Sequence, residues 1–176
     1  YKSSSDCEII VWMYKEFGIE RTVKELDGVF SFILVDFNEN TIYAARDPFG
    51  VRPMFKGIYN NDIAFCSEIK GISDLCSDIE PFKPGCWWSS KDNSYNEYFS
   101  YAFPCSFVSD NTDNNDGEIT DICKNINSIL KKSVEKRLLS DRKIGCLLSG
   151  GVDSSLIASL VSRHFKKGEL ETFAIG

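Results

Sequence analysis

The residues best suited to chemistry stand near the C-terminus, in the segment Ser149-Gly-Gly-Val-Asp-Ser-Ser155. The pattern predicts a buried strand before it (Ile144–Leu148) and a helix after it (Ser154–Phe165). A loop that leaves a strand and enters a helix presents unpaired backbone N–H groups at the positive end of the helix dipole. Gly150 and Gly151 have no Cβ, so a phosphate can approach their backbone closely. The segment therefore predicts an anion-binding loop.

Hydroxyl groups and one carboxylate add to this loop. Ser149, Ser154 and Ser155 are further donors for a phosphate. Asp153 brings a carboxylate to the same place, which is typical of a Mg²⁺ ion held beside phosphate groups. The pattern is neither a Walker loop nor a dinucleotide fingerprint. The alternative is a tight strand-to-helix turn with a serine cap, and the residues alone do not decide between the two.

The elements around this loop indicate a parallel sheet. A further strand is expected over Leu170–Ile175, and strand, turn, helix and strand form one βαβ unit. Before the unit, apolar residues recur on one helical face. They are Ile119, Ile122, Cys123, Ile126, Ile129, Leu130, Val134 and Leu138.

The first part of the chain has a different order of elements. Ser5 and Glu8 have the spacing of a capping box, and Gly18 is expected to end the helix that follows. A second short helix is expected over residues 21–26. Alternating hairpin strands are predicted over 30–37, 41–46, 54–58, 62–66 and 86–90, and a helix over 68–75. This is the order of an α+β domain.

A polar stretch separates the two parts. Residues 109–117 hold no apolar side chain and form the strongest linker signal in the chain. The predicted organisation is therefore a first domain over 1–92, a polar linker over 93–117 and the start of an α/β domain over 118–176.

Composition excludes several classes of function. The net charge of −6 argues against a general nucleic-acid-binding role. The chain has seven cysteines and one histidine without zinc-ligand spacing, and the odd cysteine count fits a disulfide framework poorly. Reduced thiols in a cytoplasmic protein are the expectation. No apolar run is long enough to span a membrane, and no signal peptide is recognisable.

The segment Cys146–Ser155 resembles the pyrophosphate-binding loop of the ATP pyrophosphatases, and with Thr172–Gly176 it is most similar to the asparagine synthetase family. The resemblance implies an ATP site in a parallel α/β fold, with Asp153 on Mg²⁺ and the adenine on the strand before the loop. The residues implied to bind ATP or its pyrophosphate are Leu147, Leu148, Ser149, Gly150, Gly151, Asp153, Ser154 and Ser155.

The first part resembles class II glutamine amidotransferases independently. The matching segments are Asp27–Phe32, Ala45–Pro53 and Cys66–Lys70, and Ser5–Glu8 is similar to the family's glutamine-binding turn. This implies layered antiparallel sheets with helices, of the N-terminal-nucleophile hydrolase type, and Asp6 as the ligand of the glutamine α-amino group. The alternative for Asp6 is an acid in the first helical turn that stabilises the helix dipole. In the stretch Arg46–Arg52, the resemblance implies that the charged side chains mainly order the turn.

Together the two resemblances imply asparagine synthesis from aspartate, ATP and glutamine through β-aspartyl-AMP, with a homodimer left open for the full-length protein. The family's nucleophile is an N-terminal cysteine, whereas this chain begins with Tyr1. No catalytic residue is therefore assigned, and we expect the chain to be an internal piece that does not hydrolyse glutamine alone. A β-lactam synthetase-like enzyme and a truncated non-catalytic module are the alternatives.

Overall fold

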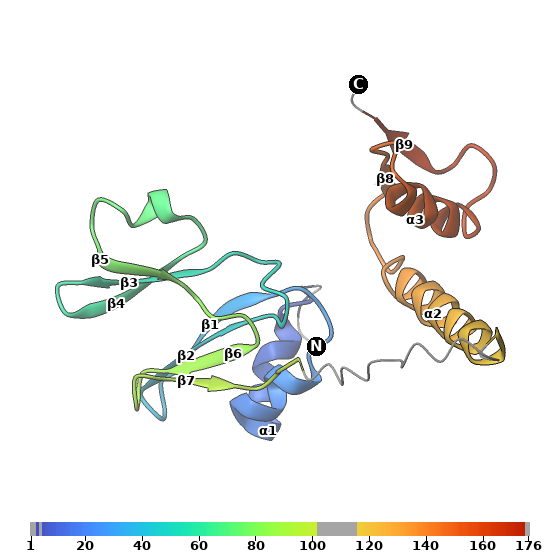
Figure 1. Cartoon of the computed structure of the whole chain (residues 1–176). Coiled ribbons are helices and arrows are strands. Elements are labelled where there is room, and N and C mark those ends of the chain that lie inside the picture. Colours follow the sequence, from blue (N-terminus) through green and yellow to red (C-terminus); the bar gives the residue numbers. More distant parts are fainter. Residues whose placement is uncertain (1–2, 4, 102–115, 175–176) are drawn as a thin grey trace. The chain divides into compact units, whose positions relative to one another are not determined.

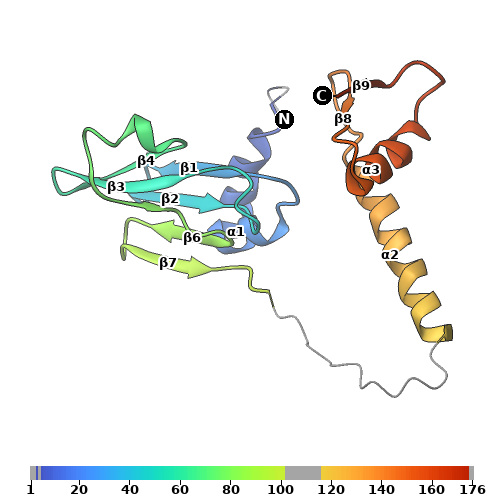
Figure 2. The ribbon, with the colours of Figure 1, turned by 45° about the horizontal axis from the view of Figure 1, so that its top comes forward.

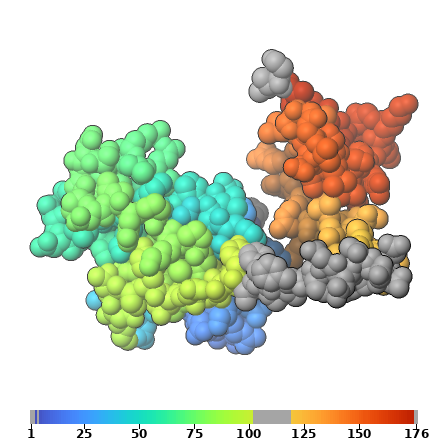
Figure 3. Space-filling view, viewed as in Figure 1, coloured from blue at the N-terminus to red at the C-terminus, as the bar shows by residue number. Residues whose placement is uncertain are grey.

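The computed structural model describes residues 3, 5–101 and 116–174 (Figure 1). The chain divides into two compact units, residues 1–105 and 106–176. Each unit has its own cluster of buried apolar side chains. In the space-filling view of Figure 3, the first unit runs from blue to yellow-green and the second from yellow to red.

The first unit contains one long helix and two antiparallel sheets. The four-stranded sheet has the order β1-β2-β6-β7, which can be followed in Figure 2, and the three-stranded sheet has the order β4-β3-β5. The elements are α1 (Glu8–Glu25), β1 (Ser31–Asp36), β2 (Thr41–Arg46), β3 (Phe55–Tyr59), β4 (Asp62–Cys66), the 3₁₀ turn η1 (Ile69–Gly71), β5 (Ser77–Pro81), β6 (Cys86–Ser89) and β7 (Ser94–Glu97).

The core of this unit lies on both faces of the four-stranded sheet. Successive residues of a strand point to opposite faces, so Ala44 and Ala45 mark the two sides. Ala45 packs against Ile19 and Val23 of α1, whereas Ala44 packs in a cluster with Met54 and other residues near the three-stranded sheet. The expected arrangement of antiparallel sheets with helices is confirmed at this level.

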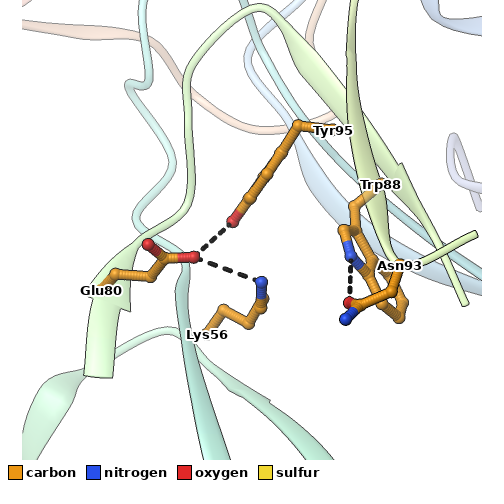
Figure 4. A network of polar contacts seen from close by, with 5 residues as sticks. All are labelled: Lys56, Glu80, Trp88, Asn93 and Tyr95. Atoms are coloured by element: carbon orange, nitrogen blue, oxygen red, sulfur yellow. Dashed lines mark hydrogen bonds and ion pairs between the residues drawn. The ribbon is translucent and has the colours of Figure 1, made fainter. Parts of the chain in front are cut away.

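A polar network joins the two sheets (Figure 4). The Lys56 ammonium on β3 lies 3.2 Å from the Glu80 carboxylate on β5. The Tyr95 hydroxyl on β7 donates to the same carboxylate at 3.3 Å. The Lys56 nitrogen also lies 5.0 Å from the centre of the Tyr95 ring and 5.9 Å from that of Trp88 on β6. Ion pair, hydrogen bond and cation–π contact thus hold one sheet to the other.

The first helix departs in part from its prediction. Gly18 has φ +75° and breaks α1 into two segments, as the sequence indicates. The predicted capping box is wrong, because the helix begins at Glu8 and Cys7 is its N-cap. The Glu8 carboxylate instead accepts hydrogen bonds from the backbone N–H and hydroxyl of Ser3. Asp6 therefore precedes the helix and is not an acid of its first turn.

Two strands were missed and one helix was overpredicted. The expected helix 68–75 is reduced to the turn η1, and β5 follows it. The strand β7 lies inside the expected linker 93–117, because Asn93 adopts φ +50° and closes a turn that pairs Ser94–Glu97 with β6. The first unit therefore extends beyond the predicted boundary at residue 92. Residues 102–115 of the expected linker lie outside the described residues.

A buried carboxylate organises the connection between β2 and β3. Asp47 is 1% exposed, and its side chain accepts backbone N–H groups from Phe49, Val51 and Arg52 at 3.0–3.1 Å. The preceding Arg46 guanidinium donates to the carbonyl oxygens of Arg52, Phe82 and Gly50 at 2.7–2.8 Å. The interpretation of Arg46 and Asp47 as residues that order the turn is confirmed.

The second unit contains α2 (Asp116–Lys136), β8 (Gly145–Leu147), α3 (Val152–Ser162) and β9 (Glu171–Phe173). The strands β8 and β9 pair in parallel, and α3 connects them, as the predicted βαβ unit requires. Val134 of α2 packs with Leu160 and Val161 of α3 to form the core of the unit.

We expect Asp47→Ala to lower the free energy of unfolding of the first unit by about 3 kcal/mol, because it leaves several buried N–H groups without an acceptor. The measurement is urea unfolding followed by tryptophan fluorescence, since Trp12, Trp87 and Trp88 all lie in this unit. Asp62→Ala, which removes an exposed carboxylate at the start of β4, is the matched control and should change it by less than about 0.5 kcal/mol. An equal loss of unfolding free energy in the two variants would show that the buried Asp47 contacts do not stabilise the unit.

Candidate functional site

The loop between β8 and α3 has the geometry expected of an anion site. Gly150 adopts φ +81°, a left-handed conformation that side chains disfavour. Gly151 is the N-cap of α3, with φ −81° and ψ 164°. The Leu148 N–H donates to the Phe173 oxygen at 2.8 Å, which anchors the start of the loop to β9. The first N–H groups of α3 have no partner within the helix and open onto this loop.

The serine hydroxyls hold the loop closed. The Ser154 hydroxyl donates to the Gly151 oxygen at 3.1 Å and accepts the Ser149 N–H at 3.3 Å. It also lies 3.0 Å from the Ser149 hydroxyl. The Ser155 hydroxyl donates to the same Gly151 oxygen at 2.8 Å. The Ser149 and Ser155 N–H groups are also engaged within the segment, so the other N–H groups at the start of α3 are the donors left open to an anion.

The other predicted residues of this site surround the loop. Leu147 is 79% exposed at the end of β8, Leu148 is half-buried, and Asp153 is exposed in the first turn of α3. Leu147, Asp153 and Ser154 also line a largely apolar groove of about 590 Å³ between α2, β8 and α3. The structure thus brings the predicted ATP residues to one end of the second unit.

Asp153 fits Mg²⁺ only together with a phosphate ligand. Within the described residues, no group of three or more His, Cys, Asp or Glu side chains could hold a metal ion. Mg²⁺ bound with nucleotides uses one or two carboxylates, the phosphates and water. One exposed carboxylate beside an anion loop satisfies that requirement, whereas a protein-only metal site would not.

Asp6 lies in an open cleft of about 800 Å³ in the first unit. The cleft runs between α1 and β1, with residues 29–38 along one wall. The Asp6 carboxylate accepts a hydrogen bond from the Cys7 thiol, with Sγ and Oδ1 3.6 Å apart. The remaining lining residues are Ile10, Val11, Tyr14, Lys15 and Arg52. A cleft of this size can hold an amino acid.

A second hydrogen-bonded carboxylate lies in the same cleft. The Tyr14 hydroxyl donates to the Asp36 carboxylate at 2.6 Å. The Asp36 carboxylate also accepts the backbone N–H groups of Glu39 and Asn38. Together with the Tyr14 hydrogen bond, which has the largest effect, these contacts hold the pKa of Asp36 below its ordinary value. Burial and the bond to Asp36 raise the pKa of Tyr14. Asp36 therefore remains ionised and engaged under neutral conditions.

Sequence reasoning missed Tyr14, Asp36 and Arg52 as cleft residues. Tyr14 follows Asp6 by eight positions and Ile10 by four, a helical spacing that could have placed Tyr14 on the Asp6 side of α1. Asp36 and Arg52 carry no such signal, because only the packing of α1 against β1 and the fold of the Asp47 turn bring them to the cleft.

In the Tyr14→Phe variant, the pKa of Asp36 should rise toward its ordinary value, as measured by NMR titration of the carboxyl carbon. A lowered folded-state pKa contributes stability that is present above the unfolded-state pKa and is lost as pH falls through the folded-state value. The stability difference between wild type and Tyr14→Phe should therefore shrink in acid. Tyr59→Phe, at an exposed tyrosine, is the control. An unchanged Asp36 titration in Tyr14→Phe would contradict the role of this bond.

At the anion loop, Gly150→Ala should lower the free energy of unfolding of the second unit by about 1–2 kcal/mol, because alanine must adopt a positive φ there. A Cβ at this position meets no atom within 4 Å, so the cost comes from the backbone alone. Gly151→Ser is the control, since its φ is ordinary and serine is a favoured N-cap residue. Hydrogen exchange of the α3 amides measures both. Faster exchange in Gly150→Ala alone is expected, and equal rates in the two variants would rule out backbone strain as the cause.

Two further findings concern the cysteines and the helices. The cysteines of the described part, which are Cys7, Cys66, Cys76, Cys86, Cys123 and Cys146, are all free. In the same part, no helix has the length and apolar character needed to cross a membrane. Cys7 is exposed.

Comparison with known families divides the chain as the fold does. A model of the glutamine amidotransferase domain family matches residues 1–98, and a model of the asparagine synthase family matches residues 125–176. The Asp6 cleft lies within the first match, and the anion loop lies within the second.

Curated relatives match the whole chain. The chain is 37% identical to the human asparagine synthetase (glutamine-hydrolysing) and 36% identical to the maize protein of the same name. The alignments cover 100% of this chain but only 35% and 30% of those proteins, so the chain spans about a third of their length. Among solved structures, glutamine phosphoribosylpyrophosphate amidotransferase from Bacillus subtilis is similar, with a TM-score of 0.52 and 16% identity over 99% of this chain and 40% of that chain. This last likeness concerns the fold alone.

Proposed function

Since the chain belongs to the glutamine amidotransferase family and continues into a match to the asparagine synthase family, we propose that it serves in glutamine-dependent synthesis of asparagine. The first unit would contribute to the release of ammonia from glutamine, and the second would contribute to the activation of aspartate by ATP. The observation that carries this proposal is that the chain matches both families, one in each unit, and aligns along its full length with the human and maize asparagine synthetases.

In the first unit, Asp6 would bind the α-ammonium group of glutamine. The position of Asp6 supports this role, because it precedes the helix N-cap and its carboxylate lies in a cleft. The Cys7 thiol is a weak donor, which leaves acceptor capacity on Asp6 for an ammonium group. We propose that this unit has the layered fold of the N-terminal-nucleophile hydrolases.

In the second unit, the loop from Ser149 to Ser155 would bind the pyrophosphate of ATP. Free N–H groups at the start of α3 and the left-handed Gly150 support this role. Leu147 and Leu148 would lie against the adenine. Mg²⁺, when bound by Asp153 and the phosphates, would neutralise charge on the leaving pyrophosphate. The β8–β9 pair would begin a larger parallel sheet of the α/β type.

In the proposed reaction, negative charge develops on the pyrophosphate, which the anion loop would bind. A β-carboxylate oxygen of aspartate attacks the α-phosphorus of ATP, and the bond to the β-phosphate breaks, which yields β-aspartyl-AMP and pyrophosphate. Ammonia then attacks the activated carbonyl carbon, and AMP leaves with the former bridging oxygen. Oriented N–H groups that meet the developing pyrophosphate charge lower the barrier of the first step without reorganisation. The reduced cysteines fit a cytoplasmic enzyme, which is the location we propose.

The proposal is tested on the protein expressed from its complete reading frame, by measuring AMP and pyrophosphate formation with aspartate, ATP and either glutamine or ammonium. Asp6→Asn should raise the glutamine KM about 10-fold or more, which is the loss of one charge-assisted contact. Asp153→Asn should lower the rate with both nitrogen donors, because both depend on ATP activation.

Asp62→Asn, which removes an exposed charge from the first unit, is the control and should match wild type in every assay. An Asp6→Asn protein with the wild-type glutamine KM would remove the assignment of Asp6. AMP formation that does not require aspartate would remove the proposed reaction.

A further inference from the structure

The connection between α2 and β8 is exposed and carries several basic side chains. It runs over residues 137–144, contains no helix or strand, and can be followed in Figure 1. Leu139 is 95% exposed, and residues 140–143 are exposed as well. A segment without regular hydrogen-bonded structure can enter the groove of another protein without unfolding the unit that carries it. The connection is therefore accessible to a modifying enzyme.

Ser140 lies in this connection with basic side chains on both sides. Arg137 precedes it by three positions, and Arg142 and Lys143 follow it. The Ser140 hydroxyl oxygen accepts the Arg142 backbone N–H at 3.0 Å. A hydroxyl that accepts one hydrogen bond still has its own proton to give away. Ser140 thus combines an exposed hydroxyl with a local excess of positive charge, which is the setting that favours the addition of a phosphate group.

A second serine of the same unit has a similar sequence context but another structural setting. Ser133 directly follows Lys131 and Lys132. It lies within α2, its side chain is half-buried, and its carbonyl oxygen accepts the Arg137 guanidinium at 3.1 Å. An enzyme could reach this hydroxyl only by unwinding the helix. The sequence therefore offers two serines beside basic residues, and the fold leaves Ser140 as the accessible one.

We propose that Ser140 is a phosphorylation site for a protein kinase that selects basic residues before the acceptor serine. Such a kinase recognises its substrate by charge complementarity, so Lys136 and Arg137 on the N-terminal side of Ser140 contribute to binding. In the transfer, the Ser140 oxygen attacks the γ-phosphorus of ATP, the bond to the oxygen of the β-phosphate breaks, and ADP leaves. The hydroxyl proton passes to the catalytic carboxylate of the kinase.

The phosphate changes the charge of the connection that leads into β8. Over residues 137–143, three basic side chains stand beside one acidic side chain, Asp141. A phosphate group adds about two negative charges at neutral pH, which offsets this positive excess. Because the Arg142 N–H already lies on the Ser140 oxygen, the phosphate oxygens are held close to Arg142 and can form charge-assisted hydrogen bonds there. This inference is independent of the reaction proposed for the whole protein.

The test incubates the protein from its complete reading frame with γ-labelled ATP and the purified catalytic subunit of a kinase that selects arginine before serine. Aspartate is omitted, so that the protein itself does not consume the ATP. Mass spectrometry of the peptides from the second unit should then place the phosphate on Ser140. Ser140→Ala should abolish the label in these peptides, whereas Ser133→Ala should leave it unchanged.

Charge variants test the recognition by basic residues. Arg137→Gln should lower kcat/KM for phosphorylation of Ser140 about 10-fold or more, which is the loss of one charge-assisted contact. Lys132→Gln removes the same charge from within α2 and should leave the rate unchanged. Arg137→Lys keeps the charge and should restore part of the rate, which separates recognition by charge from damage to the fold. Equal rates in Arg137→Gln and Lys132→Gln would overturn the role of Arg137 in recognition.

A free peptide with the sequence of residues 134–143 is measured beside the protein. An unlabelled Ser140 in the wild-type protein overturns the proposal in either case. A label on the peptide alone would mean that the folded protein hides the serine, and a label on neither would mean that the kinase does not recognise the sequence. Phosphate on Ser133 in place of Ser140 would also overturn it, because accessibility in the fold would then not select the site.

Discussion

The buried Asp47 carboxylate is the interaction on which the first unit depends most. It accepts three backbone N–H groups from the turn that follows it, while Arg46 donates to three carbonyl oxygens around the same turn. Burying a carboxyl group that is only 1% exposed is costly unless its oxygens accept hydrogen bonds. These contacts therefore order the connection from β2 to β3, which joins the four-stranded sheet to the three-stranded sheet.

This constraint also reaches the cleft. The same turn is hydrogen-bonded to Phe30 and to Ser31 at the start of β1, which anchors the backbone of Arg52 to the cleft wall. On the opposite side, α1 carries Asp6 just before its first turn and Tyr14 within it.

In the second unit, a short segment of the chain orders the candidate site. At the anion loop, the left-handed Gly150 reverses the chain, and the hydroxyls of Ser154 and Ser155 hold Gly151 at the helix start. The side chains thus fix the loop, and the first backbone N–H groups of α3 have no partner within the helix. Asp153 adds a carboxylate from the first turn of α3. Nearly all of this geometry arises within seven consecutive residues.

The anion loop is built from neighbouring residues, whereas the cleft of the first unit is built from distant ones. This difference explains which features the sequence alone determined. The loop around Gly150, the break at Gly18 and the hairpin of β1 and β2 were predictable, because each depends on neighbouring residues and on local backbone preferences. The strand β7 was not, since its polar residues form a strand only by pairing with β6. Likewise, the tertiary structure alone brought Asp36 and Arg52 into the cleft of Asp6, because residues distant in sequence meet only when helix and sheets pack together.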